Sequence, residues 1–301
     1  MKGLRLRAPF PLGSPTWPTT VPRPPVESRT GLDYDTSWAR RYPARLARAV
    51  IVDDVIRPIV HLLGSPTVAG LDRIEHLDAP VIFAANHQSH FDTPLLLSTL
   101  PPRFRHRTLV AAGADYFFRS RPMGTISALS IGAIPVERFR VNRRSGDLSV
   151  ALIEDGWSVV IFPEGGRTPD GWAREFRAGA AYLSLRSGAP IVPVHVEGTR
   201  RVWKKGQNIP LPVKRDEAVT VTFGAAIRPE PGEDTRRLGA RVQDAVAVLA
   251  DEAASDWWTA RRRAAEGATP AITGPGAGAW RRSWALKEKR RPLSSTAKSW
   301  P

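Results

Sequence analysis

Six short apolar runs, separated by segments of helical periodicity, constrain the fold of this chain more than any other feature. Each run has the length of one buried strand, and the segments between the runs repeat apolar residues at the three- and four-residue spacing of a helix. Alternation of this kind predicts a single α/β domain, with a largely parallel mixed sheet flanked by helices. We expect strands at 80–85, 107–112, 132–136, 157–162, 190–196 and 219–223, and helices at 93–100, 121–130, 144–155, 177–187 and 234–254.

The rest of the chain, outside residues 65–256, lacks this alternation. Residues 1–33 are rich in Pro, Arg and Thr and are expected to be disordered. Residues 34–64 predict an amphipathic helical segment, which Pro43 and Pro58 could split into two pieces. Residues 257–301 form a basic, Trp-containing tail, in which the regular pattern is lost beyond Thr259. We therefore expect one domain with an N-terminal helical segment and two irregular ends.

Arginines occupy one side of the first half of the predicted helical segment. Apolar residues recur near helical spacing from Trp38 to Leu63, and much of the other side is taken by Arg40, Arg41, Arg45 and Arg48. A basic amphipathic helix can lie in a membrane interface, and it can equally dock on the domain. The sequence favours neither arrangement.

The net charge of +15 at pH 7 is concentrated at the two ends of the chain. Residues 1–50 carry a net charge of +6 and residues 257–301 carry +8, so the central region 51–256 has only +1. Tryptophan beside Lys and Arg suits an anionic membrane surface, although it could also bind RNA. The neutral central region argues against a nucleic-acid-binding protein, and we expect no nucleic-acid partner. Seven of the ten tryptophans lie in these ends: Trp17, Trp38, Trp257, Trp258, Trp280, Trp284 and Trp300.

Two absences in the sequence narrow the possible chemistry. The chain has no cysteine, which excludes disulfides and a cysteine nucleophile and is compatible with a reducing cytosol. No stretch approaches the ~18 consecutive apolar residues that a membrane-spanning helix needs. We expect a soluble or peripheral protein.

The run Asn86-His87-Gln88-Ser89-His90-Phe91-Asp92 directly follows an apolar strand. Loops after the strands of an α/β sheet are where reacting groups gather. The spacing allows the Asp92 carboxylate to fold back onto the His87 ring, which would fix the tautomer and make the other ring nitrogen a better base. Asp92 also fits the N-cap of a helix that begins near Pro94, and the two roles are compatible.

A metal half-site is the competing interpretation of the same run. His87, His90 and Asp92 have the spacing His-x-x-His-x-Asp, which would suit a metal-dependent hydrolase. A zinc site needs a third or fourth ligand, and the other four histidines lie in no recognisable ligand motif. We expect no metal, and we expect His90 to line the wall of the site.

Three further blocks follow in order along the chain: Gly132-Ala133-Ile134-Pro135-Val136-Glu137-Arg138, Phe162-Pro163-Glu164-Gly165-Gly166-Arg167-Thr168 and Ile191-Val192-Pro193-Val194. By itself, the Arg138 guanidinium could hold a phosphate through two hydrogen bonds, or pair with Glu137. Together with the His–Asp run, the ordered blocks resemble the glycerolipid acyltransferase family over roughly residues 65–225. The region 65–256 is then expected to be an acyltransferase domain.

The resemblance implies a role for each block. His87 would be the general base and Asp92 its orienting partner, and Arg138 would bind the phosphate of the acceptor. The third block would hold the same acceptor through Gly165, Gly166, Arg167 and Thr168, while Glu164 supports the loop or binds acceptor hydroxyls. Pro193 would contact the acyl donor, although its block also fits a buried strand that ends at a proline.

The resemblance also implies the reaction. A fatty acyl group would pass from acyl-CoA or acyl carrier protein to the free hydroxyl of lysophosphatidic acid, forming phosphatidic acid for phospholipid biosynthesis. No bound cofactor is needed, and the enzyme would be peripheral, on an anionic membrane surface at the cytoplasmic face. The family usually has Thr where this chain has Gly166, which leaves open another lysolipid or a glycolipid as the acceptor.

Overall fold

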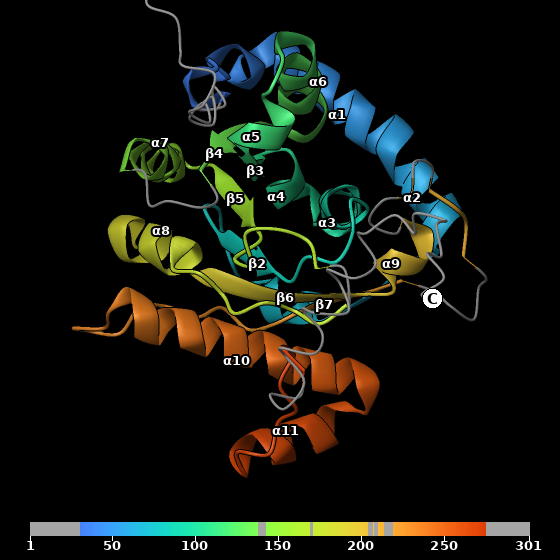
Figure 1. Cartoon of the computed structure of the whole chain (residues 1–301), viewed down its shortest axis with the longest axis vertical. Helices are drawn as coiled ribbons and strands as arrows, with labels where there is room; N and C mark the ends of the chain where they lie inside the picture. The colour runs from blue at the N-terminus through green and yellow to red at the C-terminus, as the bar shows by residue number, and fades with distance from the viewer. Residues whose placement is uncertain are drawn as a thin grey trace, which may run out of the picture.

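The computed structural model describes residues 31–137, 143–168, 171–203, 207, 210–213 and 219–274. A seven-stranded sheet runs through the centre of the molecule, and helices cover both of its faces (Figure 1). The strands are β1 Thr67–Ala69, β2 Ile82–Ala85, β3 Thr108–Gly113, β4 Ala133–Val136, β5 Ser158–Ile161, β6 Ile191–Glu197 and β7 Thr220–Phe223.

The helices of the described residues alternate with these strands as the sequence predicts. They are α1 Tyr42–Val50, α2 Arg57–Gly64, α3 Asp92–Thr99, α4 Pro102–Arg105, α5 Ala114–Phe117, α6 Arg121–Ile131, α7 Arg143–Glu154, α8 Gly179–Ser187, α9 Thr199–Val202, α10 Thr235–Ala254 and α11 Trp257–Ala265. All six expected strands and five expected helices are present within about two residues of their predicted bounds. The sequence does not predict strand β1, because three residues, two of them exposed, are too few to show the alternation of a strand.

The strand order is β1-β7-β6-β2-β5-β3-β4, and every pair is parallel except β6 with β7. The fold class predicted from the sequence, a largely parallel mixed sheet, is therefore confirmed. Because successive side chains alternate between faces, Phe83 and Val160 point to one face while Ile82 and Val159 point to the other. The parallel strands place the loops after β2, β3 and β5 at one edge of the sheet, where the site is built.

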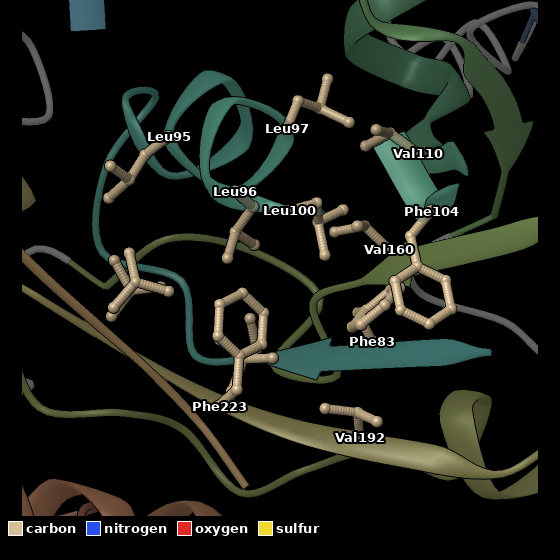
Figure 2. Close-up of a cluster of buried hydrophobic side chains, with 14 of the residues drawn as sticks. Phe83, Leu95, Leu96, Leu97, Leu100, Phe104, Val110, Val160, Val192 and Phe223 are labelled. Carbon is tan, nitrogen blue, oxygen red and sulfur yellow. The ribbon is translucent and has the colours of Figure 1, made fainter. Parts of the chain in front are cut away.

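The larger apolar core lies between the sheet and α3 (Figure 2). Phe83 of β2 contacts Phe104 and Phe223 edge to face, with ring centroids 5.4 and 6.3 Å apart. Leu95, Leu96, Leu97 and Leu100 of the α3 region join this cluster and are at most 2% exposed. Full burial of four leucines fixes the helix that begins at Asp92, and thereby one wall of the site.

The N-terminal helical segment runs continuously from α1 through a π-helical segment, Ile51–Ile56, into α2. Pro43 and Pro58 do not split it, because each lies in the first two positions of a helix. The wider π turn before Pro58 lets the helix continue without the backbone donor that proline lacks. Ile51, Ile56 and Arg57 keep right-handed helical dihedral angles throughout.

Two of the arginines of this segment face the domain, although Arg41 is exposed. Arg45 and Arg48 lie over the ring of the buried Trp157, with guanidinium carbons 5.3 and 5.9 Å from the ring centroid. Arg48 is only 5% exposed, and burial lowers its pKa to about 10, with the nearby Arg45 and Arg40 adding to the effect. The segment is therefore docked on the domain through arginines as well as through apolar residues.

A stripe of exposed apolar side chains runs along the opposite side of the same segment. We call it the apolar stripe: Tyr42, Leu46, Val50, Val55, Ile59 and Leu62, which are 48–76% exposed. Steps of four residues keep the stripe on one side of α1, and the step of five from Val50 to Val55 crosses the π-helical segment. The π turn thus keeps the two halves of the stripe in line. No helix in the described ranges is long and apolar enough to cross a bilayer.

The C-terminal part of the described chain is more regular than the sequence predicts. The helical pattern does not end at Thr259, because α11 continues to Ala265 and packs across the outer side of α10 (Figure 1). Asp256 caps α11 by accepting a hydrogen bond from the backbone N–H of Thr259. The positions before residue 31 and after residue 274, including Trp17, Trp280, Trp284 and Trp300, lie outside the described residues.

Candidate active site

The turn between β2 and α3 brings His87 and Asp92 together. The Nδ1 atom of His87 lies 2.8 Å from Oδ2 of Asp92, and Asp92 is fully buried. The same carboxylate oxygen accepts hydrogen bonds from the backbone N–H groups of Gln88 and Ser89, at 2.7 and 2.8 Å. Because the carboxylate accepts, Nδ1 of His87 carries the proton and Nε2 keeps the lone pair of a base.

Two polar side chains of the same run fasten the turn to its neighbours. Asn86 is buried, and its amide group exchanges two hydrogen bonds with the backbone of Val196 in β6, at 2.8 and 2.7 Å. The hydroxyl of Ser89 donates to the backbone carbonyl of Trp203 at 2.6 Å. These bonds hold the turn rigidly where the strand ends, so that the His–Asp geometry does not depend on solvent.

The loop after β5 completes the surroundings of His87. The ring of Phe162 stacks on the imidazole, with centroids 4.1 Å apart and planes 21° apart. The backbone N–H of His87 donates to Oε1 of Glu164 at 2.7 Å, and the backbone N–H of Arg174 donates to Oε2 at 3.0 Å. Glu164 therefore joins the His87 backbone to the segment around Arg174.

The burial of Glu164 shifts its titration. The side chain is 1% exposed, and the loss of solvent raises its pKa to about 7, with the negative charge of Asp92 contributing. The two backbone N–H donors and the Arg174 charge act in the opposite direction. Because Glu164 does not line the cavity described below, its geometry fits the support of the loop rather than contact with acceptor hydroxyls.

A cavity of about 1520 Å³ opens at His87 and runs along the carboxyl ends of the strands. Much of its wall is apolar and comes from β3, α5 and α6, including Val110, Phe117, Met123 and Ile126. The loop after β5 adds Gly165, Gly166 and Arg167, and α8 begins another part of the wall at Gly179. This size and composition suit a ligand with a long apolar chain and an anionic end.

Gly165 has a positive φ of +69°, a conformation that side chains disfavour. A Cβ atom there would lie 3.1–3.3 Å from the side chain of Arg177, which is tighter than ordinary contact. The glycine thus lets Arg177 lie close against the loop, and both residues line the cavity. Gly165 is needed for the shape of the loop as well as for access to it.

His90 is held between aromatic rings and is not arranged as a metal ligand. Its ring centroid is 5.6 Å from that of Tyr116 and 5.4 Å from that of Trp203. Burial and, to a lesser extent, the charges of Arg167 and His87 lower the pKa of His90 to about 4. Oδ2 of Asp92 already accepts three hydrogen bonds, from the His87 ring and from two backbone N–H groups. Among the residues that the structure describes, no group of three or more His, Cys, Asp or Glu could hold a metal.

Three predicted site residues lie apart from the cavity or outside the described chain. Pro193 is a buried residue of β6 that pairs with Ala84 in the sheet, and its ring faces Gly224. Thr168 is also buried. Neither Pro193 nor Thr168 is among the described residues that line the cavity. Arg138 lies outside the described residues. The roles predicted for these three residues stay predictions.

Sequence reasoning missed several contacts of the site. Phe162 and Glu164 belong to a block that the sequence singles out, but nothing in the sequence says that they reach His87 across the sheet. Only the pairing of β5 with β2 brings them there: Ile161 lies opposite Ala84, so the residues that follow the two strands meet. Tyr116 and Trp203 carried no motif, and only the fold brings them to His90.

The fold and the site define an α/β protein in which a histidine–aspartate pair opens on a large, mostly apolar cavity. Residues 65–197 match the family model described as Acyltransferase. The solved structure of the 1-acyl-sn-glycerophosphate acyltransferase PlsC from Thermotoga maritima has the same fold, with a TM-score of 0.56 at 21% identity, over 71% of this chain and 84% of that chain.

Curated relatives agree with the family model. The chloroplastic 1-acyl-sn-glycerol-3-phosphate acyltransferase BAT2 of Brassica napus is 28% identical over 147 residues, which are 46% of this chain and 39% of that protein. The 1-acyl-sn-glycerol-3-phosphate acyltransferase beta of Homo sapiens is 32% identical over 118 residues, 38% of this chain and 40% of that protein. The chain spans about two fifths of the length of these relatives. These comparisons support the glycerolipid acyltransferase family, with the matched family domain at residues 65–197.

Proposed function

We propose that this domain transfers a fatty acyl group from a thioester to the free hydroxyl of lysophosphatidic acid, and so forms phosphatidic acid in phospholipid biosynthesis. The observation that carries the proposal is the 2.8 Å contact of His87 with the buried Asp92, at the mouth of a cavity of about 1520 Å³. Relatives that are named as 1-acyl-sn-glycerol-3-phosphate acyltransferases support the proposal at the level of the family.

The geometry supports a direct transfer. Nε2 of His87 takes the proton of the acceptor hydroxyl as its oxygen attacks the thioester carbon. The new carbon–oxygen bond forms, the carbon–sulfur bond breaks, and the thiolate leaves with the proton that the imidazolium returns. Asp92 stabilises the imidazolium through Nδ1 and keeps the ring in place. Stacking on Phe162 further restricts the rotation of the imidazole ring.

The two ends of the cavity suit the two ends of a lysophospholipid. The apolar wall from β3 and α6 suits an acyl chain, whether it comes from the donor or the acceptor. Arg167 lines the cavity beside His90 and would bind the acceptor phosphate, together with Arg138. The donor is acyl-CoA or acyl carrier protein, and both carry the acyl group on the same phosphopantetheine thiol.

We also propose that the protein works as a peripheral protein on an anionic membrane surface, at the cytoplasmic face. Its acceptor and product are bilayer lipids. The apolar stripe and Ile126 supply exposed apolar side chains beside the cavity, because α1 packs on α6 and Ile126 both lines the cavity and is 66% exposed. An exposed apolar surface of this kind is typical of an interaction site.

Replacement of the proposed base tests the chemistry. His87→Ala should lower acyl transfer from labelled acyl-CoA to lysophosphatidic acid by about a hundredfold or more, with an unchanged unfolding midpoint, because one partly exposed ring is lost. His76→Ala, at an exposed histidine far from the site, is the matched control. Near-normal turnover in His87→Ala would show that His87 is not the general base.

Replacement of Arg167 tests the acceptor. Arg167→Ala should raise the KM for lysophosphatidic acid by about ten- to hundredfold, the effect of losing one charge-assisted hydrogen bond. The KM for the donor should stay within about twofold. The effect should be much smaller for an acceptor without a phosphate monoester. Equal losses for both acceptors would mean that Arg167 shapes the loop and does not bind phosphate.

A further inference from the structure

The chain that follows α11 returns to the neighbourhood of the site. After Ala265 it turns at Gly267, which has a φ of +67°, and the backbone N–H of Ala268 donates to the carbonyl of Arg263 at 2.8 Å. Farther on, the carbonyl oxygen of Ile272 accepts a hydrogen bond from the backbone N–H of Ala173 at 3.0 Å. We call residues 266–274 the C-terminal strap.

The start of the strap is fixed by tertiary contacts of α11. Arg263 donates to the buried Asp251 of α10 at 2.6 Å, and Ala260 is fully buried between the two helices. In Figure 1, α11 lies against the side of α10 that faces away from the sheet. The anchored α11 therefore fixes the point from which the strap leaves toward Ala173.

Ala173 belongs to a short segment that is bonded from several sides at once. Arg174 donates its backbone N–H to Glu164, Phe176 donates to the side chain of Gln243 in α10 at 2.7 Å, and Arg177 donates to the carbonyl of Pro163 at 3.0 Å. The strap supplies the bond at the N-terminal end of the segment, at Ala173, and Pro163 binds the opposite end, at Arg177. Without it, Arg174 would lose the support immediately before it.

The segment matters to the site through two of its residues. Arg174 holds the same Glu164 carboxylate that accepts the backbone N–H of His87, so the two N–H groups share one buried side chain. Arg177 lies against Gly165 and lines the cavity. A shift of the segment would therefore move the support of His87 and one wall of the cavity together.

We propose that the C-terminal strap positions the segment from Ala173 to Arg177, and through Glu164 the backbone of His87, for acyl transfer. Ile272, Ala173 and Arg174 are positioning residues and do not touch the substrate. The proposal rests on the acyl-transfer function for its effect on rate, but not for its effect on structure. Consequently, amide exchange tests the strap whether or not the function is right.

The full-length variant Gly267→Val tests the strap. A branched residue disfavours the left-handed conformation at this turn, and no atom lies within 4 Å of the added Cβ, so the change acts on the direction of the strap. Gly232→Val is the matched control, with a φ of +74° and equally open space in a surface turn away from the strap. Ile272→Gly is a second variant that loosens the strap and leaves the turn intact.

Hydrogen exchange of backbone amides and steady-state kinetics give the two readouts. Gly267→Val should speed exchange at Ala173, Arg174 and His87 by about five- to tenfold, the fold-change that one lost hydrogen bond allows. It should lower kcat by a similar factor and leave both KM values within about twofold, while Gly232→Val changes neither readout.

Two outcomes would overturn the proposal. One is unchanged exchange at Arg174 and His87 in both Gly267→Val and Ile272→Gly, because the strap would then support nothing. The other is faster exchange with normal kcat, because the strap would then hold the segment without positioning the site. If the full chain itself transfers no acyl group, the proposed function fails, and exchange at His87 alone decides whether the strap positions its backbone.

Discussion

At the scale of single residues, one carboxylate organises the whole His–Asp turn. Asp92 accepts hydrogen bonds from the imidazole of His87 and from the backbone N–H groups of Gln88 and Ser89. The two backbone donors come from residues three and four positions earlier, so the turn forms from local sequence. The position of His87 also depends on more distant groups, because Phe162 stacks on the imidazole and Glu164 accepts the backbone N–H of His87. Both residues follow the neighbouring strand β5.

Glu164 makes the stability of the protein depend on pH in a defined direction. Its pKa in the folded chain is raised to about 7 from an ordinary value of 4.5. The folded state therefore binds more protons than the unfolded state between these values, and stability falls as pH rises from about 4.5 to 7. The contribution of Glu164 is fully present below pH 4.5 and is lost above pH 7, on the order of 3 kcal/mol.

The variant Glu164→Gln should remove this dependence. Urea unfolding at pH 5, 6, 7 and 8 should show a flatter fall of stability in the variant than in the native chain. The variant should also be less stable at pH 5 by about 1–3 kcal/mol, because the amide N–H₂ group of Gln meets a backbone N–H donor and one hydrogen bond is lost. Parallel pH profiles for the two chains would mean that Glu164 titrates in the fold as it does in water.

At the scale of secondary-structure elements, the N-terminal helix shows how one added residue changes a surface. A regular α-helix would rotate the apolar residues after Val50 away from those before it, because five residues exceed one turn of 3.6. The π-helical segment Ile51–Ile56 absorbs the extra residue, and Tyr42 and Leu62 end on one stripe. The same turn accommodates Pro58, so a single local feature explains both the alignment and the continuity of the helix.

The arginines of this helix show the limit of amphipathic patterns. A sequence with Arg and apolar residues on two sides predicts arginine outside. Here Trp157 offers an aromatic face at the end of the sheet, and the planar guanidinium groups of Arg45 and Arg48 stack on it. Apolar side chains are exposed instead. Their helical spacing is the same as that of a row that faces the core, so the sequence pattern does not tell the two apart.

At the scale of the whole molecule, the apolar stripe and the mouth of the cavity lie on neighbouring elements. We predict that the double variant Leu46→Glu, Leu62→Glu weakens binding to vesicles with anionic lipid by about tenfold or more, because two exposed leucines, at 55% and 76%, lose their apolar contact. Binding of the native chain should also weaken as salt rises, since attraction of Lys and Arg to the surface is screened. Sedimentation with vesicles measures both effects.

Two control variants locate the membrane-binding surface. Leu148→Glu replaces an exposed leucine of α7, which lies away from α1 and α2 in Figure 1, and it should leave vesicle binding unchanged. Trp258→Glu replaces a tryptophan of α11 that is 77% exposed. A loss of binding in Trp258→Glu with normal binding in the stripe variant would place the docking surface at the C-terminal side and contradict the prediction.

The sequence by itself determined the order of strands and helices along the chain, the α/β class and the pairing of His87 with Asp92. Each of these depends on contacts or periods within a few residues, such as the alternation along β2 or the turn from Asn86 to Asp92. Ordered motifs extended this to the family, because four blocks with fixed order carry more information than any one of them.

Only the tertiary structure decided which segments far apart in the sequence come into contact. The clamp of Glu164 on His87 spans 77 residues, and the contact of Ile272 with Ala173 spans 99. The inward arginines and the strap depend on which surfaces are left free after the core is packed. The pattern of residues along the sequence does not predict such surfaces, because they arise from the register of β2 with β5 and from the packing of α11 on α10.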